Sequence, residues 1–311
     1  MHKKIAIVFP GQASQSIGML QELALEFPTI KKIFAEASAV LNCDLWELAQ
    51  TGGEKFEKTE WVQPLLLTAD IAVWQLYVEQ GGEMPRFLAG HSLGEYAALV
   101  VANVLDFVTA LRLVQVRGKL MQEAVPVGEG AMVAIVGLDE QQILEICAEI
   151  AMEDLISIAN YNSVGQTVLA GTMNACKRAV GLAEKNGAKM AKLLPVSVPS
   201  HCKLMKPAAM RFATYLKAVN FHRPEVNVIH NVDVNCYDEP DKIREALVKQ
   251  LYSPVRWVET ILFMVNHGID LVLECGPGKV LTGLNKRISE EINAEFLGLP
   301  ANFKEILNSK F

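Results

Sequence analysis

Residues 87–98, FLAGHSLGEYAA, contain the pattern Gly90-x-Ser92-x-Gly94 between a short apolar run and a segment of helical character. This arrangement is typical of a nucleophilic serine on a sharp strand-to-helix turn, where backbone N–H groups, chiefly that of Leu93, can stabilise an oxyanion. A purely structural turn is the alternative interpretation. Hydrolases and acyl transferases both use such a turn, so the pattern alone does not say whether Ser92 passes an acyl group to water or to another acceptor.

The segments around this turn predict an α/β fold. The short apolar runs at residues 5–9, 87–89 and 271–274 are separated by helical patterns, as in a parallel sheet with helices on both faces. The middle of the chain shows a different order of elements, the βαββαβ pattern of a ferredoxin-like domain. Its expected elements are a strand (131–136), a helix (139–151), two strands (155–159 and 167–170), a helix (174–185) and a last strand (189–196). We therefore expect a large α/β-hydrolase-like domain, residues 1–127 and 197–311, with a small ferredoxin-like domain inserted at residues 128–196.

The composition excludes several classes of protein. A formal charge of −6 over 311 residues argues against a general nucleic-acid binder. The six cysteines include no CxxC pair, so neither a zinc site nor a redox dithiol is indicated, and free thiols fit a reducing cytoplasm. The most apolar of the longer runs, residues 61–78, is interrupted by polar residues and by Pro64, which indicates a buried helix rather than a membrane span. No metal ion and no cofactor is expected.

A serine hydroxyl needs a base, and His201 is the best placed of the six histidines. It follows the last strand of the small domain, where loops of both domains are expected to meet. A surface or capping histidine is the alternative. A hydrolase of this type would add an acidic residue at a strand end between serine and histidine, but Asp106, Asp139 and Asp154 look like helix caps or strand flanks. A Ser-His dyad, with the histidine oriented by a neutral group, is therefore the better interpretation.

Arg117 lies beside Gly118 on the apolar stripe of a helix near residues 107–121. A buried guanidinium needs an anionic partner, because an unpaired buried charge is very unfavourable. One interpretation is an internal salt bridge to Glu or Asp. The other is a bidentate clamp on a substrate carboxylate, which would make an acyl group with a free carboxylate the natural cargo.

Several further motifs join these residues in a recognisable combination. The chain resembles the malonyl-CoA:acyl carrier protein transacylases of bacterial fatty-acid synthesis over nearly its whole length, residues 4–290. The motifs that carry this resemblance are FPGQ (9–12), QP (63–64), GHSLGEY (90–96), RG (117–118), GAM (130–132), Asn160, PVSVPSH (195–201), QLY (250–252) and GPGKVL (276–281).

The resemblance implies a role for each matching position. Ser92 would be acylated, His201 would be its base, and Arg117 would bind the malonyl carboxylate. The main-chain carbonyl of Gln250 would orient His201, and so it would be the neutral group that takes the place of the acidic residue of a hydrolase triad. The remaining positions are the oxyanion-hole N–H groups of Gln12 and Leu93, and the site-lining residues Gln63, His91, Asn160 and Ser200.

The implied reaction is ping-pong transfer of a malonyl group from malonyl-CoA to the phosphopantetheine thiol of acyl carrier protein, by a monomer. A serine hydrolase and a non-catalytic scaffold are the rivals. Because the carrier is acidic in this family, docking would need a local basic patch, for which the candidates are Lys189, Lys192, Lys286 and Arg287. One departure from the family pattern is Ala13, where glycine is usual. At positive φ an alanine there would cost on the order of 1 kcal/mol.

Overall fold

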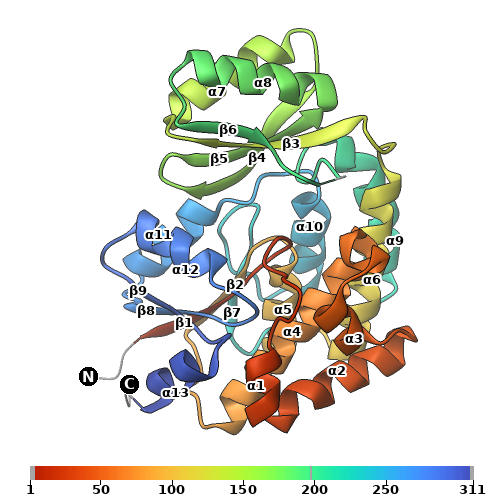
Figure 1. The fold of residues 1–311 in the computed structure, drawn as a ribbon, viewed down its shortest axis with the longest axis vertical. Helices are drawn as coiled ribbons and strands as arrows, with labels where there is room; N and C mark the ends of the chain where they lie inside the picture. The colour runs from red at the N-terminus through yellow and green to blue at the C-terminus, as the bar shows by residue number, and fades with distance from the viewer. Residues whose placement is uncertain (1–3, 197, 309–311) are drawn as a thin grey trace.

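The computed structural model describes residues 4–196 and 198–308, and these form two stacked parts, each built on its own β-sheet (Figure 1). The larger part holds a five-stranded parallel sheet in the order β7-β2-β1-β8-β9. Its strands are β1 Ile5–Phe9, β2 Phe87–Gly90, β7 Asn227–Ile229, β8 Leu271–Glu274 and β9 Asn293–Phe296.

Helices cover both faces of this sheet, as the apolar runs predict. Alternate side chains of β1 point to opposite faces because a strand has a side-chain period of two. Ile5, Ile7 and Phe9 join the core formed with α2, α4 and their neighbours, whereas Ala6 and Val8 pack with α11 and α12. The helices of this part are α1 Gln21–Glu26, α2 Pro28–Leu41, α3 Leu45–Thr51, α4 Thr59–Glu79, α5 Gly94–Val101, α6 Phe107–Glu123, α9 Lys206–Lys217, α10 Pro240–Gln250, α11 Trp257–Asn266, α12 Val280–Ile288 and α13 Pro300–Asn308, with 3₁₀ turns η1 Glu54–Glu57 and η2 Lys203–Met205.

The smaller part is an antiparallel sheet with the order β4-β5-β3-β6, covered on one face by α7 and α8 (Figure 1). Its chain order is strand-helix-strand-strand-helix-strand, so the predicted ferredoxin-like pattern is confirmed. The elements are β3 Gly130–Val136, α7 Glu140–Ala151, β4 Ile156–Ser163, β5 Gln166–Thr172, α8 Met173–Lys185 and β6 Met190–Leu193.

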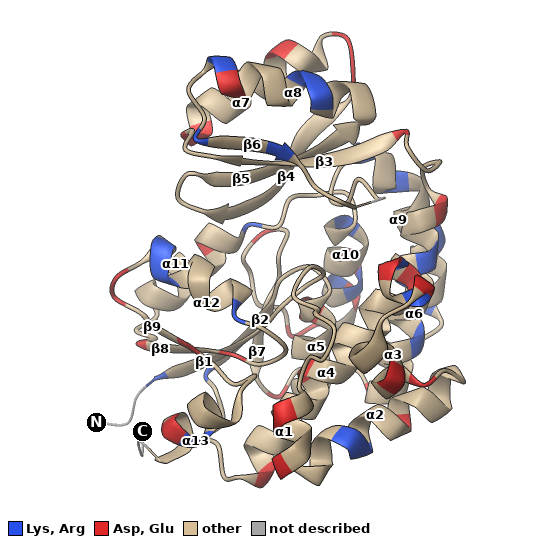
Figure 2. Cartoon of the chain, in the orientation of Figure 1, with Lys and Arg blue, Asp and Glu red and all other residues tan. Residues whose placement is uncertain are grey.

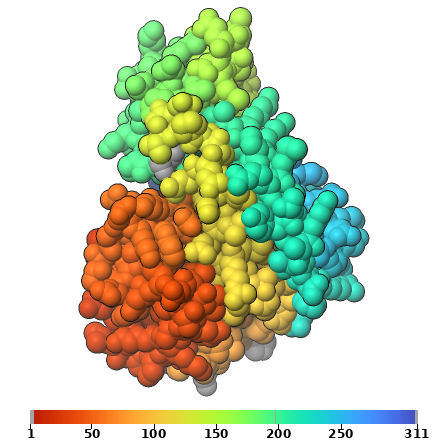
Figure 3. Space-filling model, turned by 90° about the vertical axis from the view of Figure 1, so that its right-hand side faces the viewer, coloured from red at the N-terminus to blue at the C-terminus, as the bar shows by residue number. Residues whose placement is uncertain are grey.

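These elements lie inside the range predicted for the inserted domain. The domain limits themselves stay a prediction, and the predicted limits at residues 1, 197 and 311 lie outside the described residues. In the space-filling view the small part forms the narrower upper lobe, and a notch separates it from the N-terminal helices below (Figure 3). No helix in the described part of the chain is long and apolar enough to cross a membrane.

Three predicted boundaries were wrong by three residues or more. Strand β4 continues to Ser163 because its backbone pairs with β5 despite the polar residues after Ala159. Strand β6 ends at Leu193, since the next residues turn away through a bond from the Val196 N–H to the Leu194 carbonyl. The helical pattern after the elbow predicts a helix over residues 95–104, but α5 ends at Val101, and Asn103 adopts a left-handed conformation with φ 58°.

Candidate active site

The predicted elbow is present at the carboxyl end of β2, and backbone crowding explains both of its glycines. A Cβ on Gly90 would lie 1.8 Å from the carbonyl carbon of Gly94, and one on Gly94 would lie 2.1 Å from the carbonyl oxygen of Phe9. Ser92 sits between them in the left-handed region, with φ 54°. Since non-glycine residues seldom adopt this conformation, the elbow stores strain that presents the Ser92 side chain at the head of α5.

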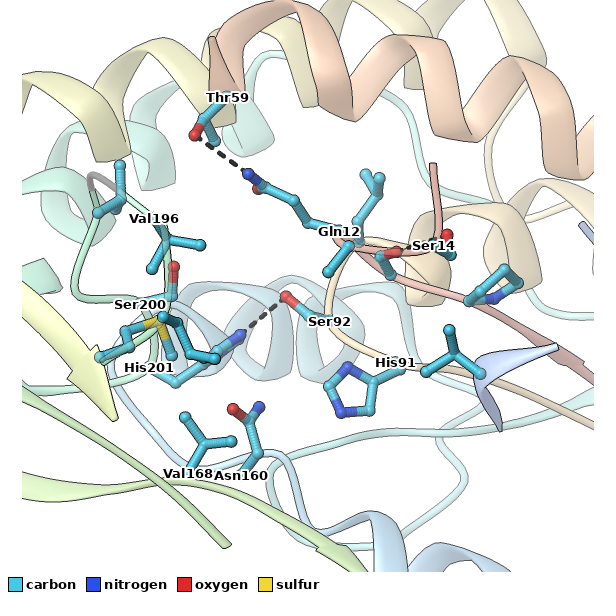
Figure 4. A pocket seen from close by; sticks show the side chains of 18 of the residues that line it. Gln12, Ser14, Thr59, His91, Ser92, Asn160, Val168, Val196, Ser200 and His201 are labelled. Atoms are coloured by element: carbon cyan, nitrogen blue, oxygen red, sulfur yellow. Dashed lines mark hydrogen bonds between the residues drawn. The ribbon is translucent and has the colours of Figure 1, made fainter. Parts of the chain in front are cut away.

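His201 reaches this serine from the seam between the two parts of the molecule. Its Nε2 lies 2.8 Å from Ser92 Oγ (Figure 4), and its Nδ1 lies 2.8 Å from the main-chain oxygen of Gln250. A carbonyl only accepts, so Nδ1 carries the proton and Nε2 is free to accept the hydroxyl proton of Ser92. Burial, followed by the charge of Arg117, lowers the pKa of His201 to about 3, which keeps the ring neutral.

None of the acids considered as a third member contacts His201. Asp106 and Asp139 accept from N–H groups of Thr109 and Gln142 as helix N-caps, and Asp154 accepts from Thr172. The neutral carbonyl of Gln250 therefore takes the place that a carboxylate occupies in a hydrolase triad.

Arg117 is buried, with 1% of its surface exposed, and points into the same pocket. Its Nη1 donates to Gln63 Oε1 (2.8 Å), while Nη2 donates to Gln250 Oε1 (2.8 Å) and Ser92 Oγ (3.1 Å). No carboxylate of the described residues forms a salt bridge with it, and its Nε has no hydrogen-bond partner among them. Burial lowers the pKa of the guanidinium, and the Tyr96 and Glu95 side chains oppose that shift. The internal salt bridge considered above is thus absent from this part of the chain.

Gln12 and Leu93 flank Ser92 in the pocket, which is where two oxyanion donors are needed. Neither backbone N–H donates to another described residue. The loop that carries Gln12 is a tight turn in which the N–H and Oγ of Ser14 both donate to the Gly11 carbonyl. Ala13 in this turn has φ 84°, so the strain expected for alanine at this position is present.

The other predicted residues line the same pocket from both parts of the molecule (Figure 4). Asn160 lies on β4, and Ser200 precedes His201. His91 is held by Asn162, with 2.9 Å between Nε2 and Oδ1, and burial lowers its pKa. The apolar part of the wall comes from the small sheet, the segment after β6, α6 and α12, with Met121, Met132, Val168, Leu194, Val196, Val198, Val280, Leu281 and Leu284.

Two residues of the site carry no role in the sequence prediction. Asn231, two residues after the end of β7, accepts from the Ser92 N–H through Oδ1 (2.8 Å) and donates from Nδ2 to the Gly90 carbonyl (2.7 Å). Glu95, inside the elbow motif, is buried beneath it. The one available signal for Asn231 is its place at the carboxyl end of a parallel strand, where sites of α/β proteins gather.

Comparison with known proteins agrees with this geometry. The family model for the acyl transferase domain matches residues 6–298. A malonyl CoA-acyl carrier protein transacylase of Salmonella typhimurium is 52% identical over 299 residues, which are 96% of this chain and 97% of that protein. The chain belongs to the malonyl-CoA–acyl carrier protein transacylase family.

Solved structures of this family superpose closely on the chain. The transacylase of Coxiella burnetii has a TM-score of 0.97 at 48% identity, covering 100% of this chain and 98% of that one. A malonyl-transacylase in complex with a type II PKS acyl-carrier protein has a TM-score of 0.97 at 50% identity, covering 98% and 99%. The predicted family and the predicted α/β fold with its smaller antiparallel part are thereby confirmed.

Proposed function

We propose that this chain transfers a malonyl group from malonyl-CoA to the phosphopantetheine thiol of acyl carrier protein, through a malonyl ester on Ser92. The observation that carries the proposal is the position of Arg117. Its guanidinium is held by two neutral amide oxygens and lies 3.1 Å from the nucleophile, without a carboxylate partner among the described residues. A carboxylate on the acyl group would complete its coordination.

In the first half-reaction His201 Nε2 takes the Ser92 proton as Oγ attacks the thioester carbon. The tetrahedral oxyanion is stabilised by the N–H groups of Gln12 and Leu93, which have no other acceptor among the described residues. Collapse breaks the C–S bond, and the imidazolium returns its proton to the sulfur of coenzyme A. The Gln250 carbonyl stabilises the charged ring through Nδ1.

In the second half-reaction the carrier thiol replaces coenzyme A. His201 takes the thiol proton, the thiolate attacks the malonyl-serine ester, and the same donors hold the second oxyanion. Ser92 leaves and recovers its proton from His201, which yields malonyl-acyl carrier protein for fatty-acid elongation. The two half-reactions share one site, so ping-pong kinetics follow.

The predicted basic residues support docking of the carrier from two sides rather than on a single patch. Lys and Arg are distributed over both parts of the molecule (Figure 2). Lys189 and Lys192 belong to the β6 edge of the small sheet, whereas Lys286 and Arg287 lie on α12, which packs against the opposite edge strand β4. Since α12 and the segment after β6 both line the pocket, the two pairs lie on or next to elements that form its walls. A monomeric, cytoplasmic enzyme fits the proposal.

Mass spectrometry of the protein mixed with malonyl-CoA tests this function. We expect a malonyl adduct on Ser92 that persists in buffer and is removed by holo-acyl carrier protein. Ser92→Ala should form no adduct. Discharge by water as fast as by the carrier would identify a hydrolase instead, and absence of any adduct would exclude malonyl transfer.

A further inference from the structure

Glu95 has a buried carboxylate beneath Ser92 and does not line the reaction pocket. Its Oε1 lies 2.7 Å from Nδ1 of His230. Its Oε2 accepts from the N–H of Asn231 (3.1 Å) and from Nε2 of Gln250 (2.9 Å). No Lys or Arg among the described residues forms an ion pair with it, so polar hydrogen atoms of neighbouring residues solvate this charge.

The partners of the Gln250 side chain allow only one orientation of its amide. Nε2 faces two groups that can only accept, the Ser92 carbonyl at 2.9 Å and Glu95 Oε2 at 2.9 Å. Oε1 faces Arg117 Nη2, which can only donate. A flipped amide would set oxygen against two oxygens and NH₂ against a guanidinium, so the Glu95 carboxylate and the Ser92 carbonyl together fix which end of Gln250 meets Arg117.

Arg117 is therefore the last member of a chain of contacts that starts at Glu95. Gln250 Oε1 is one of the two amide oxygens that set the plane of the guanidinium. The charge of Glu95 favours the protonated guanidinium. Yet Glu95 stands behind Gln250 and forms no hydrogen bond with Arg117, so it competes for none of the guanidinium donors. Nη2 already donates to Gln250 and Ser92, and the nitrogen left without a partner among the described residues is Nε.

We infer that Glu95 is a positioning residue for acyl-group selection: by fixing the Gln250 amide it orients the Arg117 guanidinium toward a carboxylate on the acyl group. This inference rests on the proposed function, because it assigns to Glu95 the preference for malonyl over an uncharged acyl group. Glu95 itself touches neither the acyl group nor the thiol.

The Glu95 carboxylate also supports the strand-to-helix turn at Ser92. Loss of this second role would change the acylation rates in a different way from loss of the first. Asn231 connects the Glu95 carboxylate with the Ser92 N–H and the Gly90 carbonyl. Loss of the contacts through Asn231 would misplace Ser92 and lower the acylation rate equally for every acyl group. Damage along the route through Gln250 would slow malonyl transfer selectively. The ratio of malonyl to acetyl acylation rates separates the two routes.

The experiment measures single-turnover acylation of Ser92 by malonyl-CoA and by acetyl-CoA in four variants. Glu95→Gln keeps one acceptor oxygen and removes the charge, and we expect the malonyl/acetyl rate ratio to fall about tenfold, the effect of weakening one hydrogen bond to a charged group. Gln250→Leu should lower the ratio at least as much. The double variant should match Gln250→Leu alone, because both changes act through one contact. Asn231→Ala, the matched control, should slow both acyl groups and leave the ratio unchanged.

Equal slowing of both acyl groups in Glu95→Gln would overturn the inference, as would a double variant whose ratio falls by the product of the two single effects. If Glu95→Gln does not fold, Glu95→Asp carries the same test, since its carboxylate is one methylene short of Gln250. Failure of the proposed function has a separate signature, which is a wild-type protein that takes up no malonyl group at all.

Discussion

Arg117 Nη2 donates a 3.1 Å hydrogen bond to Ser92 Oγ. The guanidinium thus directly contacts the oxygen atom that would attack the thioester. In the proposed mechanism this positive charge would stabilise the developing alkoxide of Ser92, and its proximity to Ser92 would restrict where an acyl carboxylate can bind. Since Nη1 and Nη2 are also fixed by Gln63 and Gln250, the guanidinium cannot follow a displaced carboxylate without breaking those bonds.

Removal of the guanidinium should change acyl preference more than overall competence. In Arg117→Ala we expect malonyl acylation of Ser92 to fall on the order of 100-fold, because a charge-assisted bidentate contact is lost. Acetyl acylation should fall less, so the relative preference shifts toward acetyl-CoA. Competition between the two thioesters, read by mass spectrometry of the adduct, measures this. Arg117→Lys keeps the charge without the planar fork and should give an intermediate preference. An unchanged preference in Arg117→Ala would contradict the clamp.

The short distance between clamp and nucleophile also predicts selection by chain length. A malonyl group has one methylene between its two carbonyl carbons and a succinyl group has two, which moves the carboxylate out of register with Arg117. One methylene in a fitted site is worth roughly 10–200-fold. We therefore expect acylation by succinyl-CoA to be slower than by malonyl-CoA within that range, measured in parallel single-turnover reactions. Equal rates would show that the carboxylate site is not fixed by Gln63 and Gln250.

Much of the fold could be predicted because most elements carry a clear local pattern. The βαββαβ order followed from alternating short apolar runs and capped helices, and Asp139 does cap α7 through a capping box. The sequence missed the second half of β4, where residues 160–162 are polar. Asn160 and Asn162 line the pocket from this strand, so the residues that serve the site remove the hydrophobic signal of the strand that carries them.

The presence of a residue in the candidate site could be predicted where a local sequence pattern indicated its chemistry. Ser92 follows from its glycines, and Arg117 from its place on an apolar stripe. Glu95 and Asn231 could not be assigned in this way, because they act through long-range contacts. Asn231 contacts Glu95 across a sequence separation of 136 and Ser92 across a separation of 139. No local pattern reports such a contact, since the two strands and α5 meet only when the parallel sheet forms.

Ala13 offers a test of strain beside the oxyanion loop. With φ 84° it occupies a conformation that costs alanine about 1 kcal/mol and glycine almost nothing. Ala13→Gly should therefore not lower the free energy of unfolding and should raise it by up to about 1 kcal/mol, despite the larger entropy of glycine in the unfolded chain. Chemical denaturation measures the change. As a control, Ala35→Gly on the exposed face of α2 should lower stability by about 1 kcal/mol. A comparable loss in Ala13→Gly would rule out strain at this turn.

The lowered pKa of His201 predicts that the rate of Ser92 acylation does not depend on pH with the ordinary histidine pKa of about 6.5. The base works only when unprotonated, so activity is retained above the pKa of the folded state and lost as the pH falls through it. Because burial and Arg117 lower this pKa to about 3, the rate of Ser92 acylation should show no half-loss near pH 6.5. Single-turnover acylation by acetyl-CoA from pH 5 to 8 measures this without titration of a substrate carboxylate. Arg117→Ala removes the second cause of the shift and should move any acid limb to higher pH. A wild-type half-loss near pH 6.5 would mean that His201 is solvated as an ordinary histidine in the working enzyme.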